Sequence, residues 1–176
     1  MEKQIKRQKI YDGHVISLVL DEVGLDDGSR AFREVVLHNG GVCIALRDDD
    51  HKFFMVKQYR YAQEQEMLEF CAGKIDKDEE RDPAVLRECS EELGYEAKNL
   101  KYFGYIAPTC GYVSERIYLY YGEKGKKVGQ HLDKDERIEP LKYSFAEIKE
   151  MIRKGEISDA KTIALMYHLE MAGLNE

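Results

Sequence analysis

Arg87, Glu88, Glu91 and Glu92 place one positive and three negative charges within six consecutive positions near the middle of the chain. In a helix, side chains three and four residues apart are neighbours, so the three glutamates share one face. Like charges at this spacing destabilise a helix, and one arginine cannot neutralise all three. Clustered carboxylates are typical ligands of Mg²⁺, particularly where a substrate phosphate completes the coordination. The residues therefore indicate a magnesium site, although a charge run taken by itself is more often a solvated acidic face.

These residues belong to a predicted helix of about three turns. Asp82 is a suitable N-cap, Pro83 suits the first helical position, and Gly94 stands where a C-cap is expected. The side opposite the glutamates carries apolar residues at core spacing, namely Leu86, Cys89 and Leu93. We therefore expect this helix to pack on a core through one side and to present carboxylates on the other.

The same residues complete a longer pattern that begins at Gly73. Five residues separate Gly73 from Glu79, and seven separate Glu79 from Arg87. From Gly73 onward the chain resembles the Nudix box, G-x5-E-x7-R-E-U-x-E-E-x-G-U with U aliphatic, at all seven fixed positions. With residue frequencies of roughly 6–7%, chance agreement somewhere in such a chain is below about one in a million. Cys89 and Tyr95 stand at the two aliphatic positions, and both are apolar enough to pack.

The resemblance to Nudix hydrolases implies metal-assisted hydrolysis of a nucleoside diphosphate linked to a further group X. The expected ion is Mg²⁺, with Mn²⁺ as a substitute. The expected metal-binding set consists of Glu88, Glu92, the main-chain carbonyl of Ala72, Glu91 and Glu79. Arg87 is expected to hold the carboxylates in place. Gly73 lets the main chain approach closely where a side chain would clash.

The resemblance also implies that a flexible acidic loop after the box supplies the base that activates water. Here that loop is residues 133–139, with the sequence DKDERIE. We expect Glu136 to be the base, with Asp133 as the alternative. A solvated acidic loop explains any one of these carboxylates equally well.

Softer motifs spread over nearly the whole chain make it most similar to the ADP-ribose pyrophosphatase branch of the family. They are Arg33-Glu34-Val35-Val36, Gln58-Tyr59-Arg60, Leu68-Glu69-x-x-Ala72-Gly73, Pro108-x-x-Gly111-x-x-Ser114-Glu115 and Asp159-x-Lys161-Thr162. A proline beyond the box is typical of that branch, and Pro108 follows Tyr95 by 13 residues. The implied substrate is the small nucleotide ADP-ribose, and the implied products are AMP and ribose 5-phosphate. Nucleotide sugars and dinucleoside polyphosphates are the alternative substrates.

Two arginines and two aromatic residues are candidates for binding that substrate. Arg60 and Arg33 can make bidentate contacts with phosphate oxygens, and an ordinary surface ion pair is the alternative for each. Tyr11 and Phe32 could stack on adenine, although taken alone they are more often core aromatics.

The resemblance further implies a homodimer in which the N-terminal strands swap between subunits. Residues 1–38 would then be a swapping β-meander and residues 39–176 the catalytic domain, within a single structural domain overall. Gly111 and Glu115 complete the expected substrate-binding set. Glu115 and Arg116 are candidates for reaching the partner's site or pairing at the interface.

The composition is that of an ordinary globular domain with a highly charged surface. The 176 residues suit one domain with a sizeable core, and the net charge of −7 argues against a general nucleic-acid or membrane-surface binder. No apolar run approaches transmembrane length, and no signal-peptide core follows the basic N-terminus. The four cysteines form no C-x-x-C pair, so we expect buried, reduced thiols in a cytoplasmic protein.

Periodicity and turn signals predict an α+β domain. Predicted strands cover residues 3–11, 15–23, 31–38, 42–46, 53–59, 100–106, 116–121 and 139–143, with a short extended piece at 68–70. A mobile polar loop is expected over 122–136. Ser144 and Glu147 form a predicted capping box that opens a helix ending near Gly155, and Asp159 is expected to cap a last helix over 160–171. The resemblance sharpens this to a Nudix-type α/β/α sandwich with a mixed sheet and an N-terminal antiparallel β-meander.

Two interpretations of another class stay open. The first is a catalytically silent domain that binds a nucleotide as a sensor, although silence usually accompanies loss of box carboxylates and none is missing here. The second treats the acidic helix as a surface for binding another protein.

Overall fold

The structure is a computed structural model that describes residues 1–134 and 136–175. Asp135 of the acidic loop and the terminal Glu176 lie outside the described residues. Within the described part, no helix is both long enough and apolar enough to cross a membrane.

The chain forms two compact units. The first unit comprises Met1–Gly40 and Ala107–Arg116. The second comprises Gly41–Ile106 and the chain from Ile117 onward. The segment that connects two strands of the second unit therefore belongs to the first.

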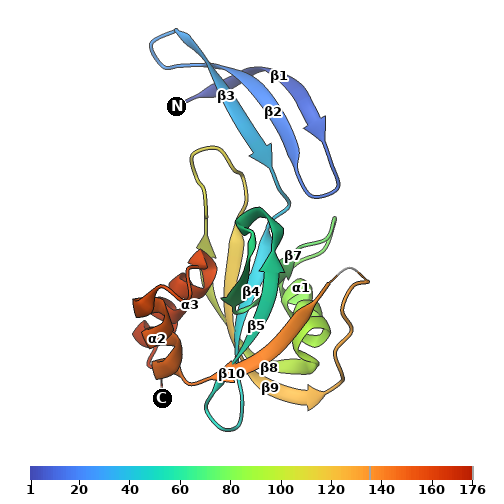
Figure 1. Cartoon of the computed structure of the whole chain (residues 1–176). Helices are drawn as coiled ribbons and strands as arrows, with labels where there is room; N and C mark the ends of the chain where they lie inside the picture. The colour runs from blue at the N-terminus through green and yellow to red at the C-terminus, as the bar shows by residue number, and fades with distance from the viewer. Residues whose placement is uncertain (135, 176) are drawn as a thin grey trace. The chain divides into compact units, whose positions relative to one another are not determined.

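The first unit contains a three-stranded antiparallel sheet in the order β1–β2–β3 (Figure 1). Its strands are β1 (Lys3–Asp12), β2 (Ser17–Gly24) and β3 (Arg30–Leu37). Gly28, in the turn between β2 and β3, adopts the left-handed conformation (φ 84°) that glycine accepts readily. The predicted N-terminal β-meander is thereby confirmed.

Residues 107–116 extend this unit along β3. The Val36 N–H donates to the carbonyl of Tyr112 at 2.8 Å, and the Ser114 N–H donates to the carbonyl of Val36 at 2.9 Å. This segment, which contains Gly111 and Glu115 of the expected substrate-binding set, is therefore anchored to the meander by main-chain hydrogen bonds.

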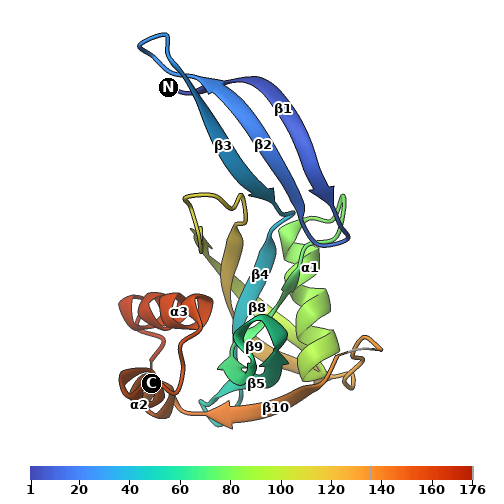
Figure 2. The same cartoon turned by 45° about the horizontal axis from the view of Figure 1, so that its top comes forward.

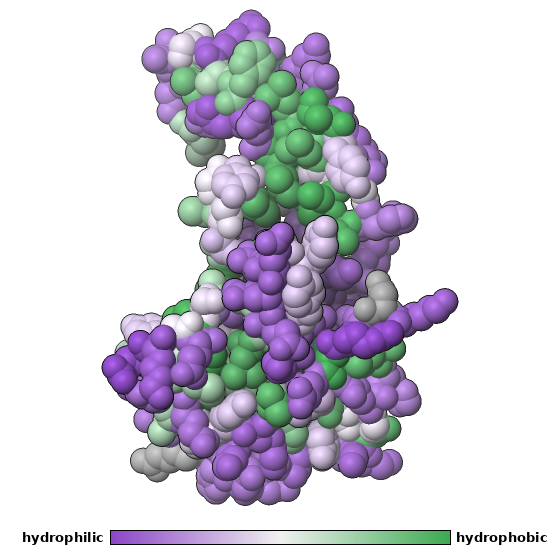
Figure 3. All heavy atoms as spheres, viewed as in Figure 1, coloured by the Kyte–Doolittle hydropathy of each residue, from purple (hydrophilic) through white to green (hydrophobic). Residues whose placement is uncertain are grey.

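Little of the meander is buried. Every residue of β1 is exposed, whereas Val19 and Val23 of β2 are buried. The carboxylate of Asp21 is also buried and accepts two hydrogen bonds from Arg7, at 2.8 and 2.6 Å. Apolar and charged residues consequently share the surface of the meander (Figure 3). The large apolar side chains exposed on its strands are Ile5, Ile10, Tyr11 and Phe32.

The second unit is built on a seven-stranded mixed sheet, whose main path runs β10–β5–β4–β9–β8. β6 pairs with β5, and β7 pairs with β4. β4 and β9 are parallel, and the other pairs are antiparallel. The strands are β4 (Gly41–Arg47), β5 (Phe53–Arg60), β6 (Gln65–Glu69), β7 (Cys71–Lys74), β8 (Tyr95–Ile106), β9 (Ile117–Lys127) and β10 (Ile138–Tyr143).

Helices cover both faces of this sheet (Figure 2). α1 (Arg81–Glu88) lies on one face, and α2 (Phe145–Lys154) and α3 (Ala160–Met171) lie on the other. Successive strand residues point to opposite faces. Ile44 of β4 therefore joins the core beneath α1, while Cys43 and Ala45 join the core beneath α2 and α3. The predicted α/β/α sandwich with a mixed sheet is confirmed.

Local sequence signals correctly placed the two C-terminal helices. Ser144 and Glu147 form both hydrogen bonds of a capping box at the start of α2, and Gly155 ends that helix with φ 77°. Asp159 accepts a hydrogen bond from the Thr162 N–H and caps α3.

α1, the helix of the Nudix box, begins at a different residue and buries partly different side chains than predicted. Glu80, not Asp82, is the N-cap of α1, and the carboxylate of Asp82 accepts a hydrogen bond from the Tyr120 hydroxyl at 2.5 Å. Leu86 is exposed, because Ala84 and Val85 supply the buried face of α1 instead. Asp82 therefore does not cap the helix, because its carboxylate is bound by Tyr120 of β9 instead.

The expected mobile loop over 122–136 is also shorter than predicted. β9 continues to Lys127, and Gly122 lies inside the strand. A Cβ at Gly122 would lie 3.0 Å from Ile44 Cδ1, so this glycine serves close packing and does not mark a turn. Pairing with the long β8 keeps this polar stretch in the sheet.

Three of the four cysteines are buried as expected, but Cys110 is exposed. It lies in the segment attached to the meander, which buries little apolar surface. The expectation of four buried thiols was therefore wrong at this position.

Candidate active site

The carboxylate of Glu88 lies directly over the main chain of Gly73. A Cβ built on Gly73 would lie 1.8 Å from Glu88 Cδ and 2.0 and 2.2 Å from its two oxygens. Only glycine fits at position 73 while Glu88 keeps this place. The end of α1 is thus brought into contact with β7, where Gly73 lies.

The position of Glu92 depends on a change of helix type after α1. After α1 the chain continues as a π-helical turn, Cys89–Leu93, which Gly94 ends with φ 75°. Single π turns are frequent at functional sites. Glu92 is 3% exposed, and its Oε2 accepts a hydrogen bond from the Ala72 N–H at 3.2 Å. Two carboxylates, Glu88 and Glu92, therefore converge on the β7 main chain at Ala72 and Gly73.

Arg87 binds three of the box glutamates. Its Nε and Nη2 donate to the two oxygens of Glu79 at 3.0 and 2.9 Å. Its Nη1 donates to Glu88 and to Glu91, both at 2.9 Å. Nη2 also donates to the carbonyl of Lys74 at 3.0 Å. Arg87 is therefore fully occupied in holding these carboxylates and the end of β7.

Burial raises the pKa of both carboxylates that face β7. It raises the pKa of Glu92 to about 8, and the neighbouring charge of Glu88 adds to this effect. It raises the pKa of Glu88 to about 6, although Arg87 opposes the shift. Two neighbouring carboxylates that resist ionisation favour a nearby positive charge.

The residues present fit a hard divalent cation that is shared with water and substrate. No three or more His, Cys, Asp or Glu side chains of the described chain are arranged to hold a metal by themselves. Within a strand, the N–H and C=O of one residue point to the same side. Because the Ala72 N–H points at Glu92, its carbonyl lies on the side of the carboxylates. Two carboxylates and one carbonyl form an all-oxygen donor set of the kind that Mg²⁺ accepts.

The acidic loop lies within the electrostatic reach of these carboxylates. The charge of Glu136 is among the causes that raise the pKa values of Glu88 and Glu92, after burial. The Glu136 N–H donates to the carbonyl of Asp133 at 3.0 Å, and its Oε2 accepts from the Asp133 N–H at 3.3 Å.

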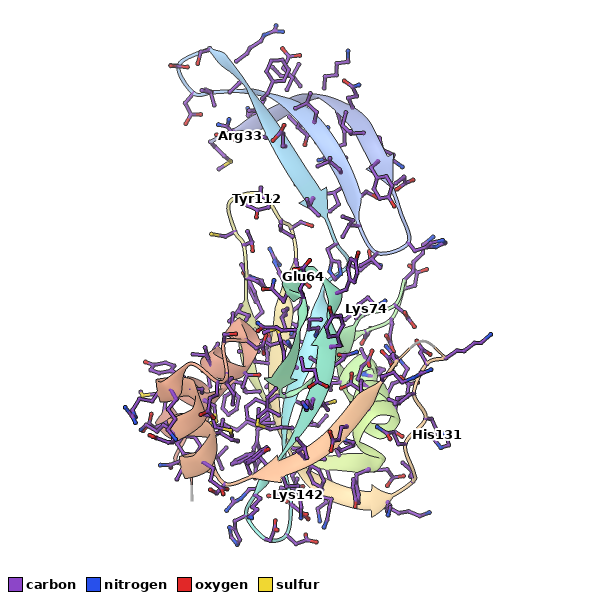
Figure 4. The ribbon with its side chains drawn as sticks, in the orientation of Figure 1. Arg33, Glu64, Lys74, Tyr112, His131 and Lys142 are labelled. Carbon is purple, nitrogen blue, oxygen red and sulfur yellow. The ribbon has the colours of Figure 1, made fainter. Side chains whose placement is uncertain are left out.

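Sequence reasoning missed the contacts that hold this loop against the π turn. The His131 N–H donates to the carbonyl of Glu91 at 2.9 Å, and Gln130 Nε2 donates to the carbonyl of Glu92 at 2.8 Å. In Figure 4, His131 lies on the segment beside α1. These main-chain carbonyls belong to a helix end, where unpaired carbonyls are expected, but no sequence signal identified their partners.

Arg60, expected to contact phosphate, forms a bidentate pair with Glu69. Its Nε and Nη2 each donate to a Glu69 oxygen at 2.7 Å. Glu69 is 1% exposed and also contacts the ammonium of Lys161. Neither Glu69 nor Lys161 was predicted as part of a site.

The remaining candidates lie in the first unit. Arg33 forms an ion pair with Glu2, through Nε at 3.1 Å and Nη2 at 2.5 Å. This is the surface ion pair that had been left open as the alternative. Gly111 is exposed, and apart from its chain neighbours no atom of the described residues lies within 4 Å of a Cβ built on it. A carboxylate oxygen of Glu115 lies 3.4 Å from the ring Nδ1 of His38.

Tyr11 and Phe32 are not core residues, since they are 57% and 67% exposed. They pair with Leu18 and Glu22 of β2, four residues apart. At about 3.3 Å per residue, their main chains are therefore roughly 13 Å apart along the sheet. The ring of Tyr11 also lies over Gly13, where a Cβ would be 2.6 Å from Tyr11 Cε1. The two rings consequently do not form one stacking pair within a single meander.

Comparison with known proteins assigns the chain to a family. Residues 37–166 match the NUDIX domain. The chain belongs to the Nudix family. The resemblance inferred from the box is confirmed, and the match covers the whole mixed sheet, α1, α2 and the box contacts described above.

Three relatives and one solved structure show what else the chain is similar to. The methanol dehydrogenase activator of Bacillus methanolicus is 34% identical, over 97% of this chain and 93% of that protein. The ADP-ribose pyrophosphatase of Bacillus subtilis (strain 168) is 33% identical over the same shares. The GDP-mannose pyrophosphatase of Salmonella typhimurium is 31% identical, over 82% of this chain and 81% of that protein.

The crystal structure of an ADP compounds hydrolase has a TM-score of 0.85 at 18% identity, covering 98% of this chain and 96% of that one. At this identity the match supports the Nudix fold, which is already confirmed by the sheet and its helices.

Proposed function

We propose that this Nudix protein hydrolyses the diphosphate of ADP-ribose to AMP and ribose 5-phosphate in the presence of Mg²⁺. The observation that carries the proposal is the convergence of Glu88 and Glu92 on the main chain of Ala72 and Gly73. The full-length similarity to a protein named ADP-ribose pyrophosphatase supports the choice of substrate.

Glu88, Glu92 and the Ala72 carbonyl would hold the magnesium ion, with Glu91 available at the exposed rim of the cluster. A bound magnesium ion neutralises the diphosphate and acidifies a coordinated water. Arg87 keeps Glu88 and Glu91 in place and binds Glu79 through both of its oxygens. Glu79 would therefore act on the site through Arg87 unless it rotates to become a further ligand.

The water-activating base would be Glu136, with Asp133 as the alternative. The proximity of Glu136 to both metal-binding carboxylates supports this choice, because its charge acts on each of them. Glu136 would remove a proton from water as the water attacks phosphorus, and the bridging oxygen would leave with one phosphate.

Arg60 would contact the diphosphate, because the guanidinium edge that includes Nη1 is not used in its pair with Glu69. The residues expected to bind the remainder of the substrate are Arg33, Phe32, Tyr11, Gly111 and Glu115. We propose that residues 1–38 swap between two copies of the chain and bring Arg33, Phe32 and Tyr11 to the catalytic domain, residues 39–176, of the partner. Gly111 and Glu115 belong to residues 39–176 themselves. The large exposed apolar side chains of the meander support such an interface.

Sedimentation of the purified protein tests the dimer. A sedimentation coefficient for twice the chain mass of 20.4 kDa is expected, whereas a stable monomer at working concentration would refute the swapped arrangement. We place the enzyme in the cytoplasm, where the three buried cysteines would stay reduced.

A nucleotide sugar such as GDP-mannose is the second candidate substrate, because relatives with that named activity are 31% identical to this chain. Turnover of ADP-ribose, GDP-mannose and a dinucleoside polyphosphate should be compared with Mg²⁺ and with Mn²⁺, by following the phosphorylated products. We expect the highest kcat/KM for ADP-ribose. Tight nucleotide binding with no turnover of any compound would instead indicate a sensor and refute the proposed activity.

A further inference from the structure

Four charged residues, Arg60, Glu69, Lys161 and Asp159, form a cluster where β5 and β6 meet the start of α3, and Glu69 at its centre is buried. Glu69 accepts two hydrogen bonds from Arg60 at 2.7 Å, and its Oε2 also contacts Lys161. Lys161 donates in addition to Asp159 Oδ1 at 2.8 Å. Arg60 and Lys161 thus alternate with Glu69 and Asp159, and the charges of the cluster sum to zero.

The cluster is fixed at its far end by main-chain contacts. Asp159 Oδ2 accepts from the Thr162 N–H at 2.9 Å and from the Thr162 hydroxyl at 2.6 Å. The same hydroxyl accepts from the Phe70 N–H at 2.9 Å. Thr162 is fully buried, and Phe70 follows Glu69 directly. A continuous set of hydrogen bonds therefore runs from α3 to Arg60.

Stability alone does not explain this cluster. Removing charges from water is costly, and well-packed apolar side chains of similar volume are often as stable as a buried ion pair. Burial alone would raise the pKa of Glu69, but Arg60 and Lys161 lower it below its usual value, so the carboxylate stays ionised. The gain from such a network is a fixed geometry for its outermost member.

That outermost member is Arg60. Its side chain is 36% exposed, whereas those of Glu69 and Lys161 are 2% and 11% exposed. The contacts to Glu69 use Nε and Nη2 and leave Nη1 with no hydrogen bond among the described residues. The charge of Glu92 acts on Arg60, which places the guanidinium in the field of the metal-binding carboxylates.

We propose that Glu69, Lys161 and Asp159 are positioning residues, which lock Arg60 so that its free guanidinium edge faces the diphosphate of the substrate. The proposal rests on the proposed function of the same site. Locking removes rotamer freedom before binding, and a rigid planar donor suits phosphate better than a mobile one.

A double-mutant cycle tests the proposal. Arg60→Ala, Glu69→Gln and the double variant are compared with wild type by kcat and KM for ADP-ribose. The Kd for inorganic pyrophosphate with Mg²⁺ is measured in parallel. We expect Glu69→Gln to raise KM and Kd about tenfold, with kcat within about threefold of wild type, as for loss of one charge-assisted contact. Because Glu69 acts through Arg60, Glu69→Gln should have no further effect in the Arg60→Ala background. Independent, multiplying effects would overturn the proposal.

Lys161→Met provides a second route if Glu69→Gln does not fold. This substitution should raise KM and Kd in the protein that keeps Arg60 but not in the Arg60→Ala variant. Lys142→Met is the matched control, since Lys142 also pairs with two carboxylates, donating to Asp48 at 2.6 Å and to Asp50 at 3.1 Å. Figure 4 labels Lys142 near β10. Lys142 of β10 lies opposite Phe54 of β5. Phe54 precedes Arg60 by six residues, so Lys142 lies roughly 20 Å from Arg60 along β5.

The control should leave KM and Kd unchanged. Equal rises in the Lys142 and Lys161 variants would show a general structural effect and overturn the proposal. Absence of wild-type turnover would refute the proposed activity alone, because the pyrophosphate cycle would still show whether Glu69 and Lys161 act through Arg60.

Discussion

Replacing Gly73 by alanine should abolish most activity while leaving the fold intact. The added Cβ would lie 1.8 Å from Glu88 Cδ. An ordinary contact between carbon atoms is about 3.5 Å, so the carboxylate must move by roughly 1.7 Å. The atoms that must move belong to the end of a flexible side chain, so the main chain of α1 and β7 can keep its place.

A displacement of this size is large for a catalytic group. Misplacing a reacting group by about 1 Å can lower the rate about 100-fold. We therefore expect Gly73→Ala to lower kcat for ADP-ribose at least about 100-fold and to weaken Mg²⁺ binding, with little change in melting temperature. Steady-state kinetics, calorimetric titration with Mg²⁺ and thermal unfolding provide the three measurements.

Gly24→Ala is a suitable control, because a Cβ there would make an ordinary contact with Ile5 Cδ1 at 3.4 Å. It should keep wild-type kcat. If Gly73→Ala also kept kcat within about threefold of wild type, Glu88 would not need to lie over β7. The assignment of Glu88 and the Ala72–Gly73 main chain to one metal site would then be wrong.

Four further predictions concern single groups. Glu92→Gln should lower kcat by several orders of magnitude with circular dichroism unchanged, and near-normal turnover would refute the metal site. In metal-free protein the pKa of Glu92 is about 8, against an ordinary 4.5, so the folded state binds the proton more tightly than the unfolded chain. The contribution of Glu92 to the free energy of unfolding is therefore full below about pH 4.5 and is lost as pH rises to about 8. Urea titrations at several pH values should show this decrease in the free energy of unfolding for wild type. They should not show it for Glu92→Gln or with saturating Mg²⁺. Glu136→Gln should lower kcat by about 100-fold or more, a much larger change than in Mg²⁺ affinity, whereas Asp133→Asn should keep most activity, and the reverse ranking would exchange their roles. An alkylating reagent should modify Cys110 in the native protein and leave the three buried thiols unmodified, as mass spectrometry of digested protein would show.

The parts of the site that depend on local helix geometry were predictable from the sequence. Glu88 and Glu92 are four residues apart, and this spacing alone places them on one side of a helix. The π turn at Cys89–Leu93 and the Glu80 cap were not predictable, because they depend on packing against the sheet. Asp82 illustrates the limit, since the Tyr120 hydroxyl that it binds comes from a strand 38 positions further along the chain.

The arginines show a second limit. Arg60 and Arg33 have the same chemistry, and sequence offered a phosphate contact or an ion pair for each. The structure pairs Arg60 with a buried glutamate and Arg33 with an exposed one, Glu2. Only the three-dimensional neighbours distinguish an anchored cation with one free edge from an ordinary surface pair, whose contribution to stability is small.

The net charge of −7 makes the supply of positive charge the main problem for a protein that binds a diphosphate. Arg87 does not solve it, because all its hydrogen bonds go to glutamates and to the carbonyl of Lys74. Arg87 thus organises negative charge for a cation, whereas Arg60 is organised by the negative charge of Glu69 and keeps an edge free. In the proposed site the two arginines would perform opposite tasks, and for this reason the substitutions proposed for their partners should separate effects on metal binding from effects on substrate binding.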